Sequence, residues 1–285
     1  MGDPNATPAA TTGAGTNAGA GAGSGAAPAA AGGAVTSPTI QCDKAAAPAD
    51  NKDGFPYWMR HAIGLGRTSG GWVNGFEGGF VDDPNDPGGA TNHGVTFTVF
   101  QSAITKGIVS GYSATVPSLK TLTKEDAAKI AKSVFWNVVS KPIKEPRLQM
   151  IMSELKWAGV TYGIFNKWMQ GYCNQRVGSS LTADGYPGPA SYKVYNSLSK
   201  QIVDEIVDNF APSVIAGLKT LKYKGKSQFD TYGLGWSRRV VVYQKILDAF
   251  PTATDPSITD SCLDASGWKM TQIDDFLATK GKLHK

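Results

Sequence analysis

The sequence predicts a mainly α fold. Apolar residues recur at helical spacing in several segments, little of the chain alternates with period two, and stretches rich in Gly or Pro separate the segments. The 285 residues are enough to bury a sizeable core. We therefore expect short helices around a glycine-rich turn region in the first half of the chain and further helices in the second half.

Residues 1–54 are predicted to form a disordered leader. Ala and Gly dominate this segment, and such small side chains cannot bury enough apolar area to offset the entropy of ordering the chain. The segment also lacks the basic and strongly apolar regions of a secretory signal, so no signal peptide is expected. No later apolar run is long enough to predict membrane insertion.

Residues 55–146 read as a first folded unit of short helices. Thr96 is suited to cap a helix that Gly107 ends, and Thr123 begins a capping-box pattern before a second apolar face. Two prolines then break the pattern, which places the unit boundary between residues 146 and 147. The apolar positions of the two helices are Phe97, Phe100 and Ile104, and then Ile130, Val134, Phe135 and Val138.

Residues 147–251 are predicted to form a second helical unit. Its opening amphipathic run is interpreted as one helix, a polar loop follows from Gly178 to Pro189, and later apolar runs predict further helices. Residues 252–285 form a polar tail with at most one short helix. The apolar positions are, run by run, Ile151, Leu155, Ala158, Tyr162, Phe165 and Met169, then Val194, Leu198, Ile202, Ile206 and Phe210, and finally Trp236, Val240, Tyr243 and Ile246.

The spacing of the cysteines and histidines, together with the net charge, excludes several classes of function. The three cysteines have no C-x-x-C spacing and specify neither a disulfide framework nor a zinc site, although one bridge between Cys42 and Cys262 stays open. The histidines lack zinc-ligand spacing, so no metal and no cofactor are expected. The net charge of +5 favours an anionic polymer as partner. No nucleic-acid motif is present, so nucleic acid is not the expected polymer.

The most informative segment is residues 76–96, which read Phe-Glu-Gly-Gly-Phe-Val-Asp-Asp-Pro-Asn-Asp-Pro-Gly-Gly-Ala-Thr-Asn-His-Gly-Val-Thr. Cleavage of a glycosidic bond needs a carboxylic acid that protonates the leaving oxygen, and a second group that positions water or stabilises the transition state. Glu77, at the end of a short helix expected over residues 72–76, is suited to be the acid. Gly78 and Gly79 would let the chain turn sharply and a sugar approach.

The second group is expected to be Asp86, because its loop of Pro and Gly can hold a carboxylate opposite Glu77. Thr91 could orient water with its hydroxyl. A structural interpretation stands beside each: a surface carboxylate for Glu77, a turn residue for Asp86, and a hydroxyl that satisfies the loop backbone for Thr91. Most aromatic residues are expected in the core rather than against a sugar: Tyr57, Trp58, Trp72, Trp136, Trp157, Trp168 and Trp236.

The stretch Glu-Gly-Gly, Asp-Pro-Gly-Gly-Ala-Thr-Asn and Gly-Val-Thr resembles the signature of the glycoside hydrolase family 108 N-acetylmuramidases. The order Glu77, Asp86, Thr91 is similar to the catalytic triad of phage-type lysozymes, with the Asp-to-Thr spacing about one residue shorter. His93 stands where the family more often has tyrosine. The resemblance implies that these three residues are catalytic, and that the substrate-binding residues beside them are Gly78, Gly79, Asn92 and His93.

Residues from about 148 to 247 resemble the peptidoglycan-binding domain that usually follows this module, in Asp-Gly-Tyr-Pro-Gly-Pro and Gly-Trp-Ser-Arg-Arg-Val. The two resemblances imply a lysozyme-like helical domain with a short turn or β region after the catalytic helix, followed by a helical peptidoglycan-binding domain. Arg238 and Arg239, in the second motif, fit either a solvated helix face or a contact with stem-peptide carboxylates.

The implied partner is bacterial peptidoglycan. The implied source is a phage, with the leader a candidate for attachment to a virion or tail assembly. Synthesis would then take place in the host cytoplasm, with action on the cell wall or periplasm, or from within a virion.

Three functions remain open from the sequence. The first is hydrolysis of the MurNAc–GlcNAc bond with Glu77 as general acid and Asp86 and Thr91 placing water. The second is a lytic transglycosylase in which Glu77 acts as acid and then base, and the third is a non-catalytic wall-binding or virion protein. The sequence favours the first.

Overall fold

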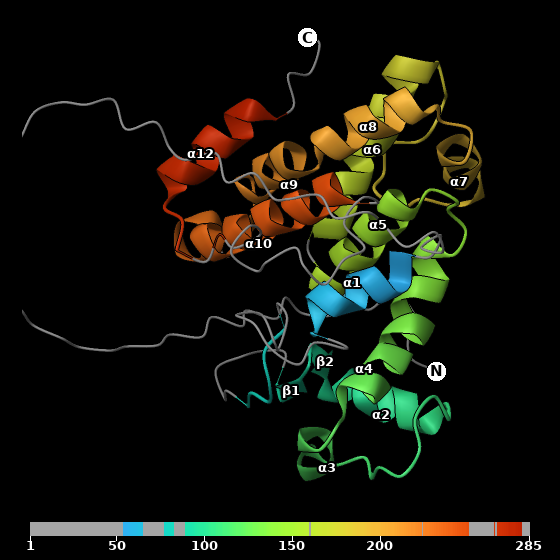
Figure 1. Ribbon diagram of the computed structural model, residues 1–285, viewed down its shortest axis with the longest axis vertical. Helices are drawn as coiled ribbons and strands as arrows, with labels where there is room; N and C mark the ends of the chain where they lie inside the picture. Colours follow the sequence, from blue (N-terminus) through green and yellow to red (C-terminus); the bar gives the residue numbers. More distant parts are fainter. Residues whose placement is uncertain are drawn as a thin grey trace, which may run out of the picture.

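The computed structural model describes residues 54–64, 77–82, 89–159, 161–223, 225–250, 265 and 267–280. In these ranges the chain is mostly helical, with two small antiparallel hairpins, so the predicted mainly α class is confirmed (Figure 1). The leader before residue 54, the helix expected over residues 72–76, Asp86 and the cysteines Cys42 and Cys262 lie outside the described residues. The structure describes no helix long and apolar enough to cross a membrane.

The first hairpin and the helices after it form the lower part of the molecule in Figure 1. Thr96 caps α2, because its hydroxyl accepts a hydrogen bond from Val99 N at 3.4 Å, and Gly107 follows the helix end with a φ of 65°. Both predicted signals are therefore confirmed. The elements are β1 (Thr91–Asn92), β2 (Val95–Thr96), α2 (Phe97–Thr105) and α3 (Val116–Lys120), and α1 (Gly54–Ala62) lies above them.

The helical segment after Thr123 changes its winding halfway. Thr123 caps α4 (Lys124–Ala131) by accepting a hydrogen bond from Asp126 N at 3.1 Å, as the sequence predicts. The chain continues as the π-helix η1 (Lys132–Ser140), in which Lys141 N donates to Trp136 O, five residues back. The wider turn changes which residues face inward. Val138, expected on the apolar face, is 58% exposed, so that expectation is wrong.

The amphipathic run after Pro146 is two helices rather than the predicted single one. The first, α5 (Pro146–Ala158), ends at Gly159, whose φ of 83° is a left-handed conformation that stops the helix. The second, α6, spans Thr161–Val177. The apolar period continues across the break, which is why the sequence pattern suggested one helix.

The remaining helices pack beside α5 and α6 in the upper part of Figure 1. The later apolar runs form helices as predicted, and the described part of the tail contains a short helix. A second hairpin, which the sequence pattern did not indicate, precedes the longest helix. The elements are α7 (Pro189–Tyr195), α8 (Lys200–Asp208), α9 (Phe210–Leu218), β3 (Lys222–Tyr223), β4 (Lys226–Ser227), α10 (Phe229–Ala249) and α12 (Met270–Thr279).

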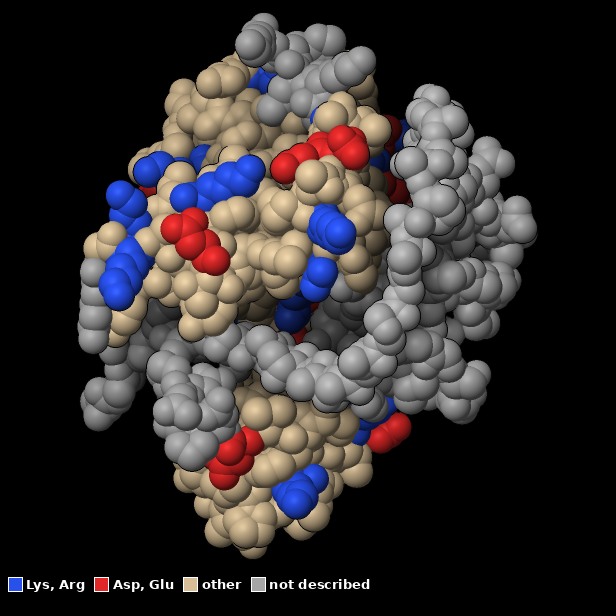
Figure 2. Space-filling view, turned by 90° about the vertical axis from the view of Figure 1, so that its left-hand side faces the viewer, with Lys and Arg blue, Asp and Glu red and all other residues tan. Residues whose placement is uncertain are grey.

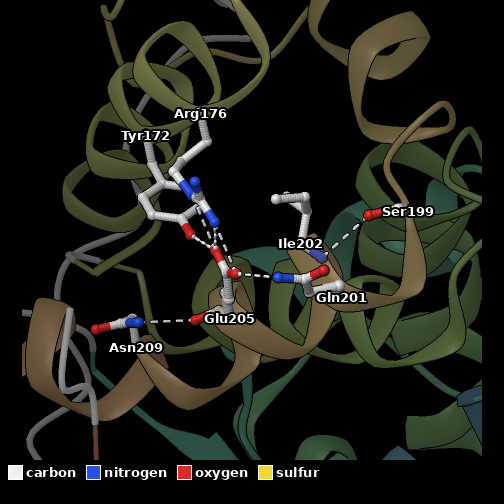
Figure 3. A network of polar contacts seen from close by, with 7 residues as sticks. All are labelled: Tyr172, Arg176, Ser199, Gln201, Ile202, Glu205 and Asn209. Atoms are coloured by element: carbon white, nitrogen blue, oxygen red, sulfur yellow. Dashed lines mark hydrogen bonds and ion pairs between the residues drawn. The ribbon is translucent and has the colours of Figure 1, made fainter. Parts of the chain in front are cut away.

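A polar network joins α6 to α8 (Figure 3). Glu205 on α8 accepts a hydrogen bond from the hydroxyl of Tyr172 and forms an ion pair with Arg176 at 2.8 Å, both on α6. Burial raises the pKa of Tyr172, whereas its hydrogen bond and that of Arg176 lower the pKa of Glu205. The network therefore ties α8 to α6 through one shared carboxylate.

The hydrophobic core is continuous from α1 to α12. Helix α5 lies at its centre, because it packs against α1, η1 and α6. The core therefore passes across residues 146 and 147, and the domain boundary placed there stays a prediction. Cys173 on α6 is a buried free thiol whose pKa burial raises to about 11.

Candidate active site

Glu77 lies at a bend in the chain that is next to the C-terminal end of α1 in space. Its backbone N–H donates to the carbonyl of Ala62, the last residue of α1, at 3.0 Å. Its side chain is only 11% exposed. The acid is therefore held inside the protein by its backbone, with most of its side chain covered.

Arg239 on α10 forms an ion pair with Glu77. The distance from Arg239 Nη2 to Glu77 Oε1 is 2.6 Å. The same nitrogen lies 2.8 Å from Glu154 Oε1 on α5, and Arg239 Nε donates to that oxygen at 2.8 Å. One guanidinium thus connects two carboxylates that come from different parts of the chain.

The two carboxylates keep Arg239 positively charged. Burial alone would lower the pKa of Arg239, but the carboxylates of Glu154 and Glu77 outweigh it and hold the pKa above its ordinary value. Arg239 therefore stays positively charged at every pH at which the protein is folded. Buried charges of this kind persist only when they are paired, as they are here.

An aromatic shell surrounds the cluster. Trp58 on α1 donates from Nε1 to Glu154 Oε2 at 2.9 Å, so it holds the oxygen that Arg239 does not bind. The Trp58 ring stacks on Trp136 at 6.0 Å between centroids and meets Trp157 edge to face at 5.7 Å. All three tryptophans are buried, which confirms the core role expected for them.

The hairpin of β1 and β2 places its turn against Glu77. His93 and Gly94 form the turn with φ values of 48° and 74°, and two positive φ angles in a two-residue loop are typical of a type I′ turn. A Cβ on Gly94 would lie 2.6 Å from Trp157 Nε1 and 2.7 Å from Glu77 Cγ. Glycine is therefore needed here both for the turn and for the close approach of the backbone to the acid.

His93 sits beside the residue that follows the acid. Burial lowers its pKa, and the positive charge of Lys124 adds to this shift, while a hydrogen bond with the backbone of Gly78 acts in the opposite direction. The imidazole is therefore neutral near pH 7. Its buried Nδ1 has no hydrogen-bond partner among the described residues. The structure thus brings His93 to the site where the sequence expects a substrate contact.

Asn92 and Thr91 have structural partners. The buried Asn92 donates from Nδ2 to the carbonyls of Leu119 and Lys120 at the end of α3, at 2.9 and 3.2 Å. The Thr91 hydroxyl donates to Gly89 O at 3.2 Å, and the Thr91 backbone pairs with Val81. These contacts anchor the hairpin. Substrate binding by Asn92 and water positioning by Thr91 stay predictions.

Gly78 and Gly79 are exposed, and among the described residues, their chain neighbours aside, no atom lies within 4 Å of a Cβ built on either residue. In the part of the chain that the structure describes, nothing packs against the Cβ positions of these two glycines, and their role in substrate binding stays a prediction. Figure 2 shows Lys and Arg side chains gathered on the upper part of the face in view, with Asp and Glu side chains between them. Asp86, expected opposite Glu77, lies outside the described residues.

Sequence reasoning missed two members of the site, Arg239 and Glu154. The interpretation of Arg239 as a solvated or stem-peptide residue is wrong, because its guanidinium is paired with two carboxylates inside the protein. Glu154 carried a usable signal: it lies within the apolar helix Met-Ile-Met-Ser-Glu-Leu-Lys-Trp, one turn from the core residue Ile151. A charged residue on an apolar helix face needs a buried partner.

The arrangement can present a carboxyl group in a fixed orientation to a group that approaches over Gly78 and Gly79. Because Arg239 occupies Oε1 of Glu77, a proton carried by the carboxyl resides on the other oxygen. Among the described residues no group of three His, Cys, Asp or Glu is arranged to hold a metal ion.

Comparison with known proteins points to one enzyme class. Residues 71–159 match the model of the family described as Glycosyl hydrolase 108, which supports a glycoside hydrolase. The matched segment includes Glu77, the first hairpin and α5, and ends before α6. The solved structure of SagA from Brucella abortus is similar to this chain, with 25% identity and a TM-score of 0.46, covering 71% of this chain and 97% of SagA. No curated protein matches the chain.

Proposed function

We propose that the protein is a lysozyme of the N-acetylmuramidase type, which hydrolyses the MurNAc–GlcNAc bond of bacterial peptidoglycan with Glu77 as general acid. The observation that carries the proposal is the covered Glu77 carboxyl, held at Oε1 by Arg239 within the segment that matches Glycosyl hydrolase 108. The exposed Gly78 and Gly79 leave an approach for a sugar.

In this reaction Glu77 donates its proton to the glycosidic oxygen, which leaves as the hydroxyl of GlcNAc. Water adds to the anomeric carbon of MurNAc and loses a proton, so that a reducing end forms. In the proposal, Asp86 takes up the proton from that water and Thr91 orients it. The net charge of +5 favours approach to the anionic wall polymer.

The test is the substitution Glu77→Gln, measured by the clearing of purified bacterial walls. General acid catalysis contributes roughly a hundred- to ten-thousand-fold in rate, so the variant should lose activity by about that factor while its circular dichroism stays unchanged. Asp82→Asn is the matched control, because Asp82 is an exposed acid in the same segment. It should clear walls at the rate of the unmodified protein.

Three other results would overturn the proposal. Anhydro-muramic ends as the main product would identify a lytic transglycosylase, because the muramic acid hydroxyl would have taken the place of water. Wall clearing by Glu77→Gln at the unmodified rate would show that Glu77 is not the acid. Wall binding without any product from the unmodified protein would identify a non-catalytic wall-binding or virion protein.

A further inference from the structure

We propose that Arg239 is a positioning residue for Glu77, so that helix α10, which lies outside the segment matching Glycosyl hydrolase 108, completes the active site. The inference rests on the proposed function. It assigns a role to the second half of the chain beyond binding to the wall.

The first argument is the geometry at Glu77. Arg239 Nη2 lies 2.6 Å from Oε1, and the guanidinium is planar and rigid. Contact at one oxygen fixes the rotation of the carboxyl group and leaves the proton on Oε2. A general acid acts only when the donated proton points at the leaving oxygen, and this contact sets that direction.

The second argument is that Glu154 holds Arg239 in place. Its Nε donates to Glu154 Oε1 at 2.8 Å, and the Glu154 side chain is only 4% exposed. Trp58 binds the other oxygen of Glu154. With both oxygens bound, Glu154 cannot rotate, so it fixes Arg239 in turn.

The third argument is the contact between α10 and α5. Tyr243, one turn after Arg239 on α10, donates its hydroxyl proton to the carbonyl of Met150, one turn before Glu154 on α5, at 3.0 Å. The two pairs therefore lie side by side along antiparallel helices. This double contact prevents α10 from sliding along α5 and keeps the guanidinium at the acid.

The charge balance explains why two carboxylates are present. Arg239 and Glu154 together are neutral, so Glu77 can carry a proton without leaving a buried guanidinium unpaired. When Glu77 is ionised, Arg239 is shared between the two acids. The pair thus accommodates both protonation states of Glu77 that a catalytic cycle requires.

The experiment compares Arg239→Gln and Arg239→Lys in the full chain, with kcat and KM measured on solubilised peptidoglycan chains. Arg239→Gln should lower kcat by about a hundred-fold, the effect of misplacing a reacting group, while KM stays nearly constant. Arg239→Lys should recover part of this loss and remain about tenfold below the unmodified protein, because an ammonium group cannot keep the fork geometry that contacts both acids.

Arg238→Gln is the matched control. Arg238 directly precedes Arg239 on α10, but its Nε donates to the carbonyl of Trp268 at 2.7 Å, away from Glu77. This variant should retain the unmodified kcat. Circular dichroism and thermal melting of each variant separate a loss of folding from a loss of positioning.

Two results overturn the inference. One is a folded Arg239→Gln with the unmodified kcat, and the other is a loss that appears entirely in KM. If Arg239→Gln does not fold, Arg239→Lys decides, and unmodified kcat in that variant overturns the inference. These results leave the proposed function intact as long as Glu77→Gln remains inactive, so the two failures are distinguishable.

Discussion

At the scale of single residues, the position of Glu77 depends on the absence of a side chain at Gly94. The turn glycine has a φ of 74°, and the side chains of Glu77 and Trp157 occupy the space that a Cβ would need. A Cβ at this position would be strained by the positive φ and would also clash with both side chains. The hairpin therefore acts as a fixed wall against which the acid side chain packs.

Gly94→Ala should destabilise the protein by about 3 kcal/mol or more, because left-handed strain and a steric clash add together, and it should reduce wall clearing. Urea unfolding and the wall-clearing rate measure the two effects. Gly107→Ala is the matched control, since Gly107 has a φ of 65° but open space around its Cβ position. It should cost only about 1 kcal/mol of strain and leave activity unchanged. Equal costs for the two variants would contradict the proposed packing.

The sequence could reveal Glu77 but not its ionic partner. The acid stands in a dense local motif of acids and glycines, whose chemistry can be interpreted without a structure. Arg239 is far away in the chain and neighbours ordinary helical residues, so only packing brings it to Glu77. Glu154 could be predicted in part. Its charge on an apolar helix face indicates a buried ion pair, but the sequence does not indicate which residue is the partner.

At the scale of elements, the helix starts follow local chemistry and the helix interiors follow packing. Thr96 and Thr123 both cap helices where the sequence predicts. By contrast, the π-helix η1, which packs against α5, and the break at the left-handed Gly159 both interrupt apolar periods that continue in the sequence. An apolar period alone cannot distinguish a wide helical turn from a regular one, which is why the exposed position of Val138 was not foreseen.

Thr123→Ala should lower the free energy of unfolding by about 1 kcal/mol, because Asp126 N loses its hydrogen-bond acceptor at the start of α4. Chemical denaturation at neutral pH measures the change. Thr105→Ala serves as the control, since this exposed hydroxyl bonds only to the carbonyl of Gln101 within α2. A cost for Thr123→Ala no larger than for Thr105→Ala would show that the cap contributes nothing to stability.

At the scale of the whole molecule, two of the polar networks between helices show how distant parts of the chain are joined. One joins α10 to α5 at the acid, and the other joins α6 to α8 through Glu205 (Figure 3). Both connect residues that no local pattern pairs. The sequence therefore predicted the helical class and most helices, but not how the second half of the chain packs against the first.

The Glu205 network should make stability depend on pH. The hydrogen bonds from Tyr172 and Arg176 lower the pKa of Glu205 below its unfolded value, so the unfolded chain binds the proton more readily. The stabilisation is present above the unfolded pKa of about 4.5 and is lost as the pH falls through the folded pKa.

Glu205→Gln should therefore be less stable than the unmodified protein at neutral pH, and the difference should shrink below about pH 4.5. Urea unfolding at a series of pH values measures it. Asp275→Asn, an exposed substitution on α12, should show no such dependence. A stability difference for Glu205→Gln that stays constant down to acidic pH would show that the network does not act through the ionised carboxylate.

The central claim is that Glu77 protonates the leaving oxygen while water forms the new bond to the anomeric carbon of MurNAc. Its most direct test is digestion of purified peptidoglycan in heavy-oxygen water, followed by mass spectrometry of the released muropeptides. The account predicts one heavy oxygen at each new MurNAc reducing end from the unmodified protein, and no such product from Glu77→Gln. Unlabelled anhydro ends, or labelled ends in equal yield from Glu77→Gln, would contradict it.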